Sequence, residues 1–134
     1  MKQAIHTPAA PAAIGPYSQA VRTSSFLFLS GQLGIDAATG TLVPEKEAQF
    51  EQLFKNIGHV LKEAGCGFED VVKTTAFVMD MADFAAFNAI YARYFPQPYP
   101  ARSVVQVAGL PKTGAYAEME VIAHCPPAQT TDRL

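Results

Sequence analysis

The chain has 134 residues, which fits a single domain, and 49% of them are hydrophobic, which is typical of a globular protein. Ten Lys and Arg against twelve Asp and Glu give a net charge of −2, so nucleic acid and anionic membranes are not expected partners. Only 16% of residues are charged, against about 25% in a typical soluble domain, and we therefore expect a homo-oligomer that covers part of the surface.

The sequence predicts no secretory signal in residues 1–17 and no membrane-spanning run. Residues 1–17 lack the apolar stretch of a signal peptide, and the longest strongly apolar run, residues 26–29, is far too short to cross a bilayer. Cys66 and Cys125 lie far apart and match no CxxC or metal-ligand spacing, which predicts reduced thiols in a cytoplasmic protein. We expect one domain over residues 1–134, with loose ends at residues 1–2 and 126–134.

The first half of the chain predicts an irregular arm, a strand and a helix. Residues 8–16 hold three prolines and form the arm, and the apolar run 26–32 (FLFLSGQ) predicts a buried strand before a turn at 36–40. A helix is predicted over residues 44–64, with Pro44 in its first turn and Gly65 just past its end. Its apolar residues share one face: Phe50, Leu53, Phe54, Ile57, Val60, Leu61 and Ala64.

The second half predicts three strands and one more helix. Residues 70–79 are rich in β-branched side chains and predict a strand, after which Asp80 or Asp83 caps a helix that ends before the prolines at 96, 98 and 100. The apolar stripe of that helix is Phe84, Phe87, Tyr91, Tyr94 and Phe95. Residues 103–108 and 116–123 predict the last two strands. This order indicates an α+β fold, in which a mainly antiparallel sheet covered on one face by two helices would bury every apolar stripe.

Arg102 is the first candidate for chemistry. The sequence has no GxGxxG, P-loop, GxSxG or HExxH pattern, and none of its three histidines has a Cys or carboxylate at ligand spacing, so we expect no metal and no cofactor. Arg102 follows a proline-rich turn and opens a strand, where a planar guanidinium suits a small carboxylate held by two parallel hydrogen bonds. A salt bridge or a solvated rim position is the alternative.

Glu118 and Glu120 are the second candidate. Alternation along the last strand places both carboxylates on one face with Tyr116 and Ile122. Carboxylates make poor core material, so one near the centre of a sheet must be paired or serve as a general base. The alternative is that both face solvent or a partner subunit.

Asn88 and two turns complete the candidates. Asn88 lies at the edge of an apolar helix stripe, where a buried amide needs hydrogen bonds, although such a residue often only ties a helix to a loop. The small-residue turns at 15–18, which includes Tyr17, and at 30–32, which includes Ser30 and Gly31, allow backbone groups to approach a ligand. A plain turn is the simpler interpretation of either one.

Six motifs, taken in this order, resemble one family over residues 3–124. The chain opens with IGPYSQA at 14–20 and continues with LSGQ at 29–32, DVVKTT at 70–75 and DF at 83–84 followed by Asn88. It closes with a paired motif, PARS at 100–103 with LPK at 110–112, and with EMEVIA at 118–123. The pattern is similar to the Rid family of reactive-intermediate imine deaminases, also called YjgF-type, and within it to the RidA branch.

The resemblance implies a chorismate-mutase-like α+β fold with a six-stranded sheet, assembled as a homotrimer with a cleft between each pair of subunits. It implies a hydrolase acting on C=N bonds, which converts 2-aminoacrylate, 2-iminopropanoate and 2-iminobutanoate to 2-oxo acids and ammonia without a cofactor. Carried over to this sequence, Arg102 would bind the substrate carboxylate and Glu118 would hold or activate water. The residues that would line the cleft are Tyr17, Ser30, Gly31 and Asn88.

The sequence departs from this pattern at three places. Val104 stands where well-known members have a cysteine, Ala117 replaces a larger aliphatic residue, and the connection from Lys112 to Glu118 is one residue longer. These departures bear on substrate preference more than on reaction type. Two other functions compete with the deaminase: a trimer that binds small carboxylates without turnover, in which Glu118 would be idle, and a ribonuclease, which the net charge of −2 disfavours.

Overall fold

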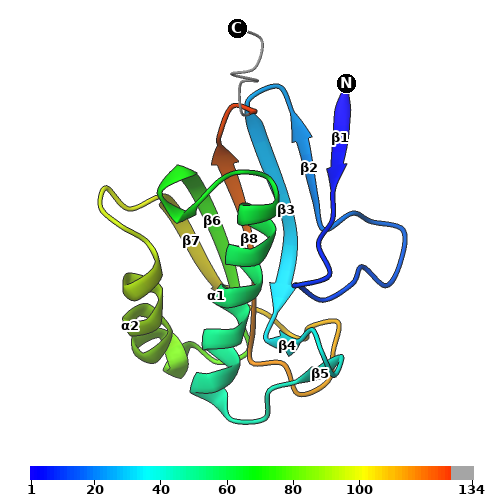
Figure 1. Ribbon diagram of the computed structural model, residues 1–134. Coiled ribbons are helices and arrows are strands. Elements are labelled where there is room, and N and C mark those ends of the chain that lie inside the picture. Colours follow the sequence, from blue (N-terminus) through cyan, green and yellow to red (C-terminus); the bar gives the residue numbers. More distant parts are fainter. Residues whose placement is uncertain (128–134) are drawn as a thin grey trace, which may run out of the picture.

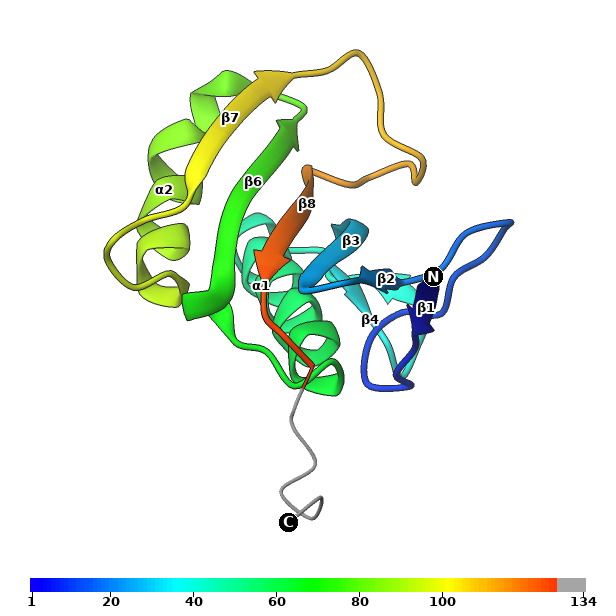
Figure 2. The same cartoon turned by 90° about the horizontal axis from the view of Figure 1, so that it is seen from above.

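The fold is built on one six-stranded sheet in the computed structural model, which describes residues 1–127. Figure 2 shows the strands spread across one curved layer. Their spatial order is β1 (Lys2–Ile5), β2 (Ala20–Thr23), β3 (Phe26–Leu33), β8 (Ala117–His124), β6 (Val71–Val78) and β7 (Ala101–Gln106). Every neighbouring pair of strands is antiparallel except β6 and β7, which are parallel. A small second sheet pairs β4 (Ile35–Asp36) with β5 (Thr41–Leu42).

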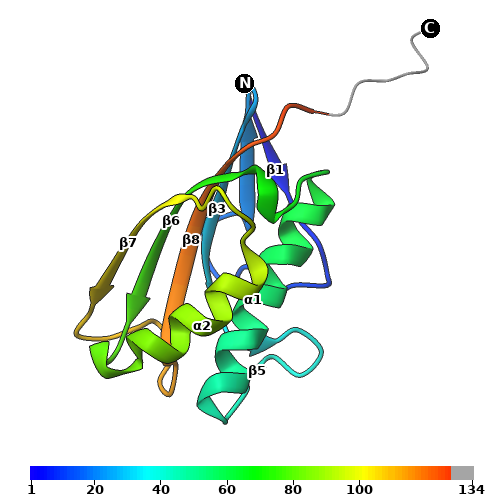
Figure 3. The same ribbon diagram turned by 90° about the vertical axis from the view of Figure 1, so that its left-hand side faces the viewer.

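Two helices, α1 (Lys46–Glu63) and α2 (Phe84–Tyr94), lie on the same face of the sheet (Figures 1 and 3). Because β6 and β7 are parallel, α2 serves as the crossover between them. The strand β8 pairs with both β3 and β6, so β7 and β8 are consecutive along the chain but are not neighbours. The predicted α+β class, with a mainly antiparallel six-stranded sheet and both helices on one face, is confirmed.

The ends of α1 are set by local capping. The Glu45 side chain accepts hydrogen bonds from the backbone N–H groups of Glu47 and Ala48, so the helix begins two residues later than the pattern predicts. At the other end Gly65 has φ +79°, a left-handed conformation that favours glycine. The Cys66 N–H then bonds to the Leu61 carbonyl at 2.9 Å, which closes the helix with the predicted Gly.

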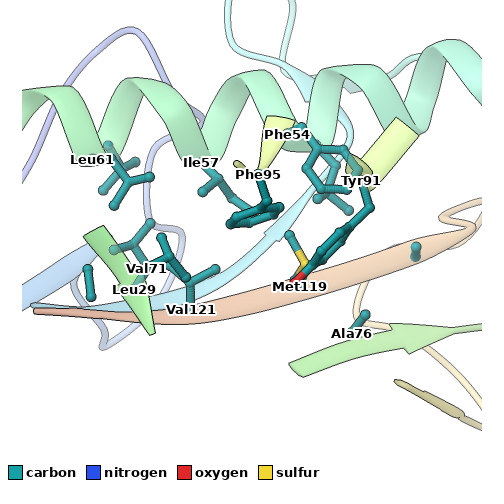
Figure 4. Packing of buried hydrophobic residues seen from close by; sticks show 14 of the residues in the cluster. Leu29, Phe54, Ile57, Leu61, Val71, Ala76, Tyr91, Phe95, Met119 and Val121 are labelled. Carbon is teal, nitrogen blue, oxygen red and sulfur yellow. The ribbon is translucent and has the colours of Figure 1, made fainter. Parts of the chain in front are cut away.

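The hydrophobic core lies between the helices and the sheet (Figure 4). The predicted stripe of α1 is buried against β3 and β8, and α2 contributes an aromatic cluster. Within that cluster the Phe54 ring lies 5.4 Å from Phe87 and 5.9 Å from Tyr91, while Tyr91 lies 4.4 Å from Phe95. Aromatic rings in this distance range attract one another beyond the area that they bury, so the cluster fixes α2 on the sheet.

Alternation along β8 divides the sheet into a helix-covered face and an uncovered face. Ala117, Met119, Val121 and Ala123 are buried, whereas Glu118, Glu120 and Ile122 lie on the other side. The predicted alternation is therefore confirmed for residues 117–123. The placement of Tyr116 on the face of Glu118 is wrong, because β8 begins at Ala117 and the Tyr116 ring packs against the core beneath Lys46 of α1. The uncovered face also carries large apolar side chains, with exposed fractions of 42% for Phe26, 43% for Phe28 and 43% for Val105.

The expectation of reduced thiols is wrong, because Cys66 and Cys125 form a disulfide. The two residues are 59 apart along the chain, so their spacing carried no signal, but their Cα atoms are 5.9 Å apart in the fold. The turn after α1 packs against the end of β8, where the buried Arg22 guanidinium donates to the carbonyls of Ala64 and Cys125. Tertiary packing therefore creates the pairing.

The two expected loose ends have different outcomes. At the N-terminus, β1 begins at Lys2, inside the stretch expected to be loose. At the C-terminus, most of the expected tail, residues 128–134, lies outside the described residues. Among residues 1–127, no helix has the length and apolar character needed to span a bilayer.

Candidate functional site

Two cavities hold the seven candidate residues, and the candidates divide between them. A cavity of about 740 Å³, here called the Glu118 cavity, is lined by Tyr17, Ser30, Gly31, Glu118 and Glu120. A second cavity of about 460 Å³, here called the Arg102 cavity, is lined by Asn88, Tyr91, Ala92, Tyr99, Pro100 and Arg102. The structure therefore brings five candidates together in one place and two in another.

Arg102 is oriented by residues of α2. Its Nη1 donates a hydrogen bond to Asn88 Oδ1 at 2.7 Å. Its guanidinium carbon lies 4.7 Å from the centre of the Tyr91 ring and 5.5 Å from that of Phe84, within the range of a cation–π contact. No carboxylate pairs with Arg102 in the described part of the chain. The guanidinium is therefore held by neutral groups, and its remaining N–H donors are free to bind an anion.

Glu118 lies against the backbone of β3, where only glycine fits. A Cβ atom placed on Gly31 would come within 2.7 Å of Glu118 Cδ, so a larger residue there would displace the carboxylate. The pairing of β3 with β8 also shifts register between Leu29 and Gln32, at Ser30 and Gly31. Such bulges re-aim side chains beside functional sites, and this one makes room for Glu118.

The Glu118 carboxylate is a group with no partner. Among residues 1–127, no hydrogen bond or ion pair to it occurs. Burial raises the pKa of Glu118 above its usual range, and the charge of Glu120 on the same face raises it further. A half-buried carboxylate with a raised pKa is suited to exchange a proton near neutral pH.

The segment 15–18 and the bulge of β3 lie side by side along the Glu118 cavity. The expected turn at 30–32 is wrong, because β3 continues to Leu33. Ser30 Oγ donates to the Ser18 carbonyl at 2.7 Å, and the Ser30 N–H donates to the Gln19 carbonyl at 3.0 Å, so the segment and the bulge are joined. Tyr17 stands beside them with 51% of its surface exposed. The phenol is therefore available to a ligand or to a second chain.

The two cavities lie on opposite faces of the sheet. Arg102 is directly opposite Thr74 of β6, whose side chain is buried under the helices, while Glu118 is opposite Phe77 of the same strand. Because Thr74 and Phe77 are three residues apart, their side chains point to opposite faces. Strand spacing places the Cα atoms of Arg102 and Glu118 about 14 Å apart. A single chain therefore does not bring the two charged groups onto one small ligand.

Sequence reasoning missed several residues of these cavities. Tyr91 and Phe84 belong to the predicted packing stripe, but both contact Arg102, and Tyr99 lines the same cavity. Lys112, which entered the sequence argument only as part of a motif, lines the Glu118 cavity. Nothing in a helical period distinguishes an aromatic ring that packs in the core from one that also supports a cation, so the signal for Tyr91 was present but ambiguous.

One group of potential metal ligands occurs within residues 1–127, and it consists of Cys66, Asp70 and Cys125. Both sulfur atoms belong to the disulfide, and none of the three residues lines either cavity. Val104, which replaces the cysteine of the resembled family, is partly buried against the core on β7, two residues from Arg102.

Comparison with known proteins gives consistent results. The family model described as Endoribonuclease L-PSP matches residues 7–125. The chain is 48% identical to the mouse 2-iminobutanoate/2-iminopropanoate deaminase, over 92% of this chain and 91% of that protein. It is 51% identical to the chloroplastic Reactive Intermediate Deaminase A of Arabidopsis thaliana, over 91% of this chain but only 65% of that longer protein. The crystal structure of RidA from an Antarctic Psychrobacter superimposes with a TM-score of 0.88 at 44% identity, covering 91% of this chain and 98% of that one.

Proposed function

We propose that this chain, which belongs to the Endoribonuclease L-PSP family of Rid and YjgF-type proteins, hydrolyses 2-imino acids such as 2-iminopropanoate and 2-iminobutanoate to 2-oxo acids and ammonia. Relatives that share about half of its residues over most of its length carry the names of imine deaminases. The observation in the structure that carries the proposal is Glu118, a carboxylate with a raised pKa that has no partner among residues 1–127 and lies in a cavity against Gly31 of β3.

The chemistry needs one cation, one proton acceptor and water. The imine carbon is already electrophilic, so catalysis requires positioning of the substrate and management of protons. Arg102 binds the substrate carboxylate, and Glu118 takes a proton from water as the water oxygen adds to the carbon of the protonated imine, which gives a neutral carbinolamine. Glu118 then returns that proton to nitrogen. As the C–N bond breaks and ammonia leaves, Glu118 takes the proton of the hydroxyl group, the C=O bond of the 2-oxo acid forms, and Glu118 afterwards releases this proton to solvent. An enamine such as 2-aminoacrylate first becomes the imine by protonation at its terminal carbon.

A shared site explains why the two charged groups are apart in one chain. Arg102 and Glu118 lie on opposite faces, so we propose that each active site combines Arg102 and Asn88 of one subunit with Tyr17, Ser30, Gly31 and Glu118 of the next. A closed homotrimer supplies three such sites. The low charged fraction and the exposed Phe26 and Phe28 on the uncovered face support burial of that face between subunits.

Turnover of a freshly generated substrate tests the proposed function. An amino-acid oxidase acting on 2-aminobutyrate supplies 2-iminobutanoate, and we expect this protein to accelerate its conversion to 2-oxobutanoate above the rate in buffer. Binding of 2-oxobutanoate without acceleration would favour the carboxylate-binding trimer. Cleavage of RNA that is lost in Arg102→Ala would favour the ribonuclease.

Complementation tests the shared site. Arg102→Ala and Glu118→Gln chains carrying different tags are co-expressed and purified through both tags. Each mixed trimer keeps one intact Arg102–Glu118 pair in three, so we expect about a third of wild-type activity from two variants that are inactive alone. Mixed trimers with no activity would place both groups of a site in one chain. Sedimentation of an active monomer near 14.4 kDa would exclude the trimer.

The compartment is also a proposal. The sequence predicts a cytoplasmic protein, whereas the Cys66–Cys125 disulfide is typical of oxidising compartments. The thiol state of the protein, measured by mass spectrometry after rapid alkylation of whole cells, decides between the two.

A further inference from the structure

The Arg102 guanidinium rests on two aromatic rings, one of which, Tyr91, belongs to the hydrophobic core. Tyr91 lies 4.7 Å and Phe84 5.5 Å from the guanidinium carbon, and both rings come from α2. Within the proposed function, we propose that Tyr91, assisted by Phe84, is a positioning residue that fixes the plane of Arg102 for two-point binding of the substrate carboxylate. Tyr91 acts through Arg102.

Tyr91 is immobilised from three sides. Its hydroxyl and Thr74 Oγ1 are 2.8 Å apart in a buried hydrogen bond, and only 5% of the residue is exposed. Its ring packs against Phe54 and Phe95. Thr74 is the residue of β6 directly opposite Arg102, so the strand that neighbours the arginine also anchors the ring on which the arginine rests. A side chain held this firmly presents its face in one orientation.

The ring and Asn88 together leave one edge of the guanidinium for a ligand. Asn88 accepts from Nη1 at 2.7 Å, and the aromatic ring covers one face of the planar group. Asn88 uses an N–H of Nη1 only, so the N–H groups of Nη2 and Nε remain as a planar fork for a carboxylate. Bidentate binding of a carboxylate depends on the direction of the guanidinium fork, so fixing its plane before substrate arrives strengthens binding.

Three variants separate positioning from packing. Tyr91→Leu removes the ring, and Tyr91→Phe keeps it while losing the hydroxyl. Phe50→Leu is the matched control, because Phe50 is a fully buried aromatic residue whose ring contact is with Phe87 and which lines neither cavity. The measurements are kcat and KM for 2-iminobutanoate, the dissociation constant for pyruvate by calorimetry, and the melting temperature.

We expect Tyr91→Leu to raise KM and the pyruvate dissociation constant about three- to thirtyfold, because the cation–π contact with Arg102 is lost. We expect little change in kcat, because the bound substrate and the transition state lose the same binding energy. Tyr91→Phe should restore both values to within about twofold of wild type. Phe50→Leu should lower the melting temperature but leave both constants unchanged.

Two results would overturn the inference: unchanged pyruvate binding in Tyr91→Leu, or equal weakening in Phe50→Leu. If Tyr91→Leu does not fold, Phe84→Leu tests the inference instead, because Phe84 is partly exposed. We expect this variant to weaken pyruvate binding about two- to fivefold. The pyruvate measurement does not depend on turnover, so a wild-type protein that binds pyruvate but deaminates nothing would refute the proposed function alone.

Discussion

The Arg102 cavity and the Glu118 cavity hold opposite charges in opposite ways. Arg102 is fixed by side chains: an amide from Asn88 and the faces of two aromatic rings. Glu118 is placed by the backbone, because Gly31 and the bulge in β3 leave room for a carboxylate that has no partner within the described residues. In the proposed mechanism, one cavity restrains the group that holds the substrate, and the other leaves free the group that moves a proton.

The contrast shows how one sheet supports two tasks. A binding cation benefits from fixed orientation, because directional hydrogen bonds are lost when it rotates. A general base benefits from incomplete pairing, because a salt bridge would lower its pKa and remove its basicity near neutral pH. The four predictions that follow test this contrast, from the largest expected effect on activity to the smallest.

Glu118→Gln should lower kcat about 10²- to 10⁴-fold, the usual contribution of a general base. Pyruvate binding should change by less than about twofold, because the proposed ligand of the carboxylate is Arg102 and not Glu118. The pKa of Glu118 is higher in the native state than in the unfolded state, so the free energy of unfolding falls as pH rises from the unfolded-state pKa through the native-state pKa. The amide of the glutamine variant does not ionise, so the variant does not lose this stability. Its melting temperature at neutral pH should therefore equal or exceed that of wild type. Parallel loss of kcat, binding and stability would indicate a structural carboxylate.

Arg102→Lys should lower kcat/KM about ten- to a hundredfold, because an ammonium cannot offer a planar fork and one charge-assisted hydrogen bond contributes about 1.5–3 kcal/mol. The loss should appear in pyruvate binding as well, unlike the loss in Glu118→Gln. Unchanged kinetics in Arg102→Lys would mean that the substrate carboxylate binds elsewhere.

Glu120→Gln should move the acidic limb of the pH profile of kcat/KM to lower pH. Glu118 must be ionised to act as a base, so activity falls as pH drops through its pKa. Burial is the larger cause of the raised pKa and the negative charge of Glu120 the smaller, so removing that charge lowers the pKa only in part. Rates at about pH 5 to 9 measure the limb, with Glu47→Gln on the exposed surface of α1 as the control. A limb that does not move would show that the two carboxylates are not coupled.

The double variant Cys66→Ala, Cys125→Ala should keep the wild-type kcat, since neither cysteine lines a cavity and hydrolysis by water needs no thiol. Its free energy of unfolding should fall by about 4 kcal/mol, the contribution expected of a disulfide that closes a loop of this length. Urea unfolding with and without reductant measures the loss, and reduced wild type should match the variant. A fall in kcat in a variant that remains folded would show that the disulfide contributes to the activity.

The sequence predicted most of the periodic elements, because local patterns determine them. Apolar spacing located α1 to within two residues at its start, and the alternation of β8 correctly placed Glu118 and Glu120 on the uncovered face. The short strands β1, β2, β4 and β5 carry too few residues for a period and were not predicted individually. The disulfide was missed because its two cysteines meet only when the turn after α1 packs on the end of β8.

By itself the sequence determined the α+β class, the two covering helices and a set of candidate residues whose order resembles a known family. Residue type and local period suffice for these, since they depend on neighbours along the chain. Only the tertiary structure decided which candidates meet. Strand order separates β7 from β8 by β6, and the pleat then sends Arg102 and Glu118 to opposite faces. It also decided that Tyr91, which a helical stripe marks as core, supports the arginine, because contact between α2 and β7 is a property of packing and not of spacing.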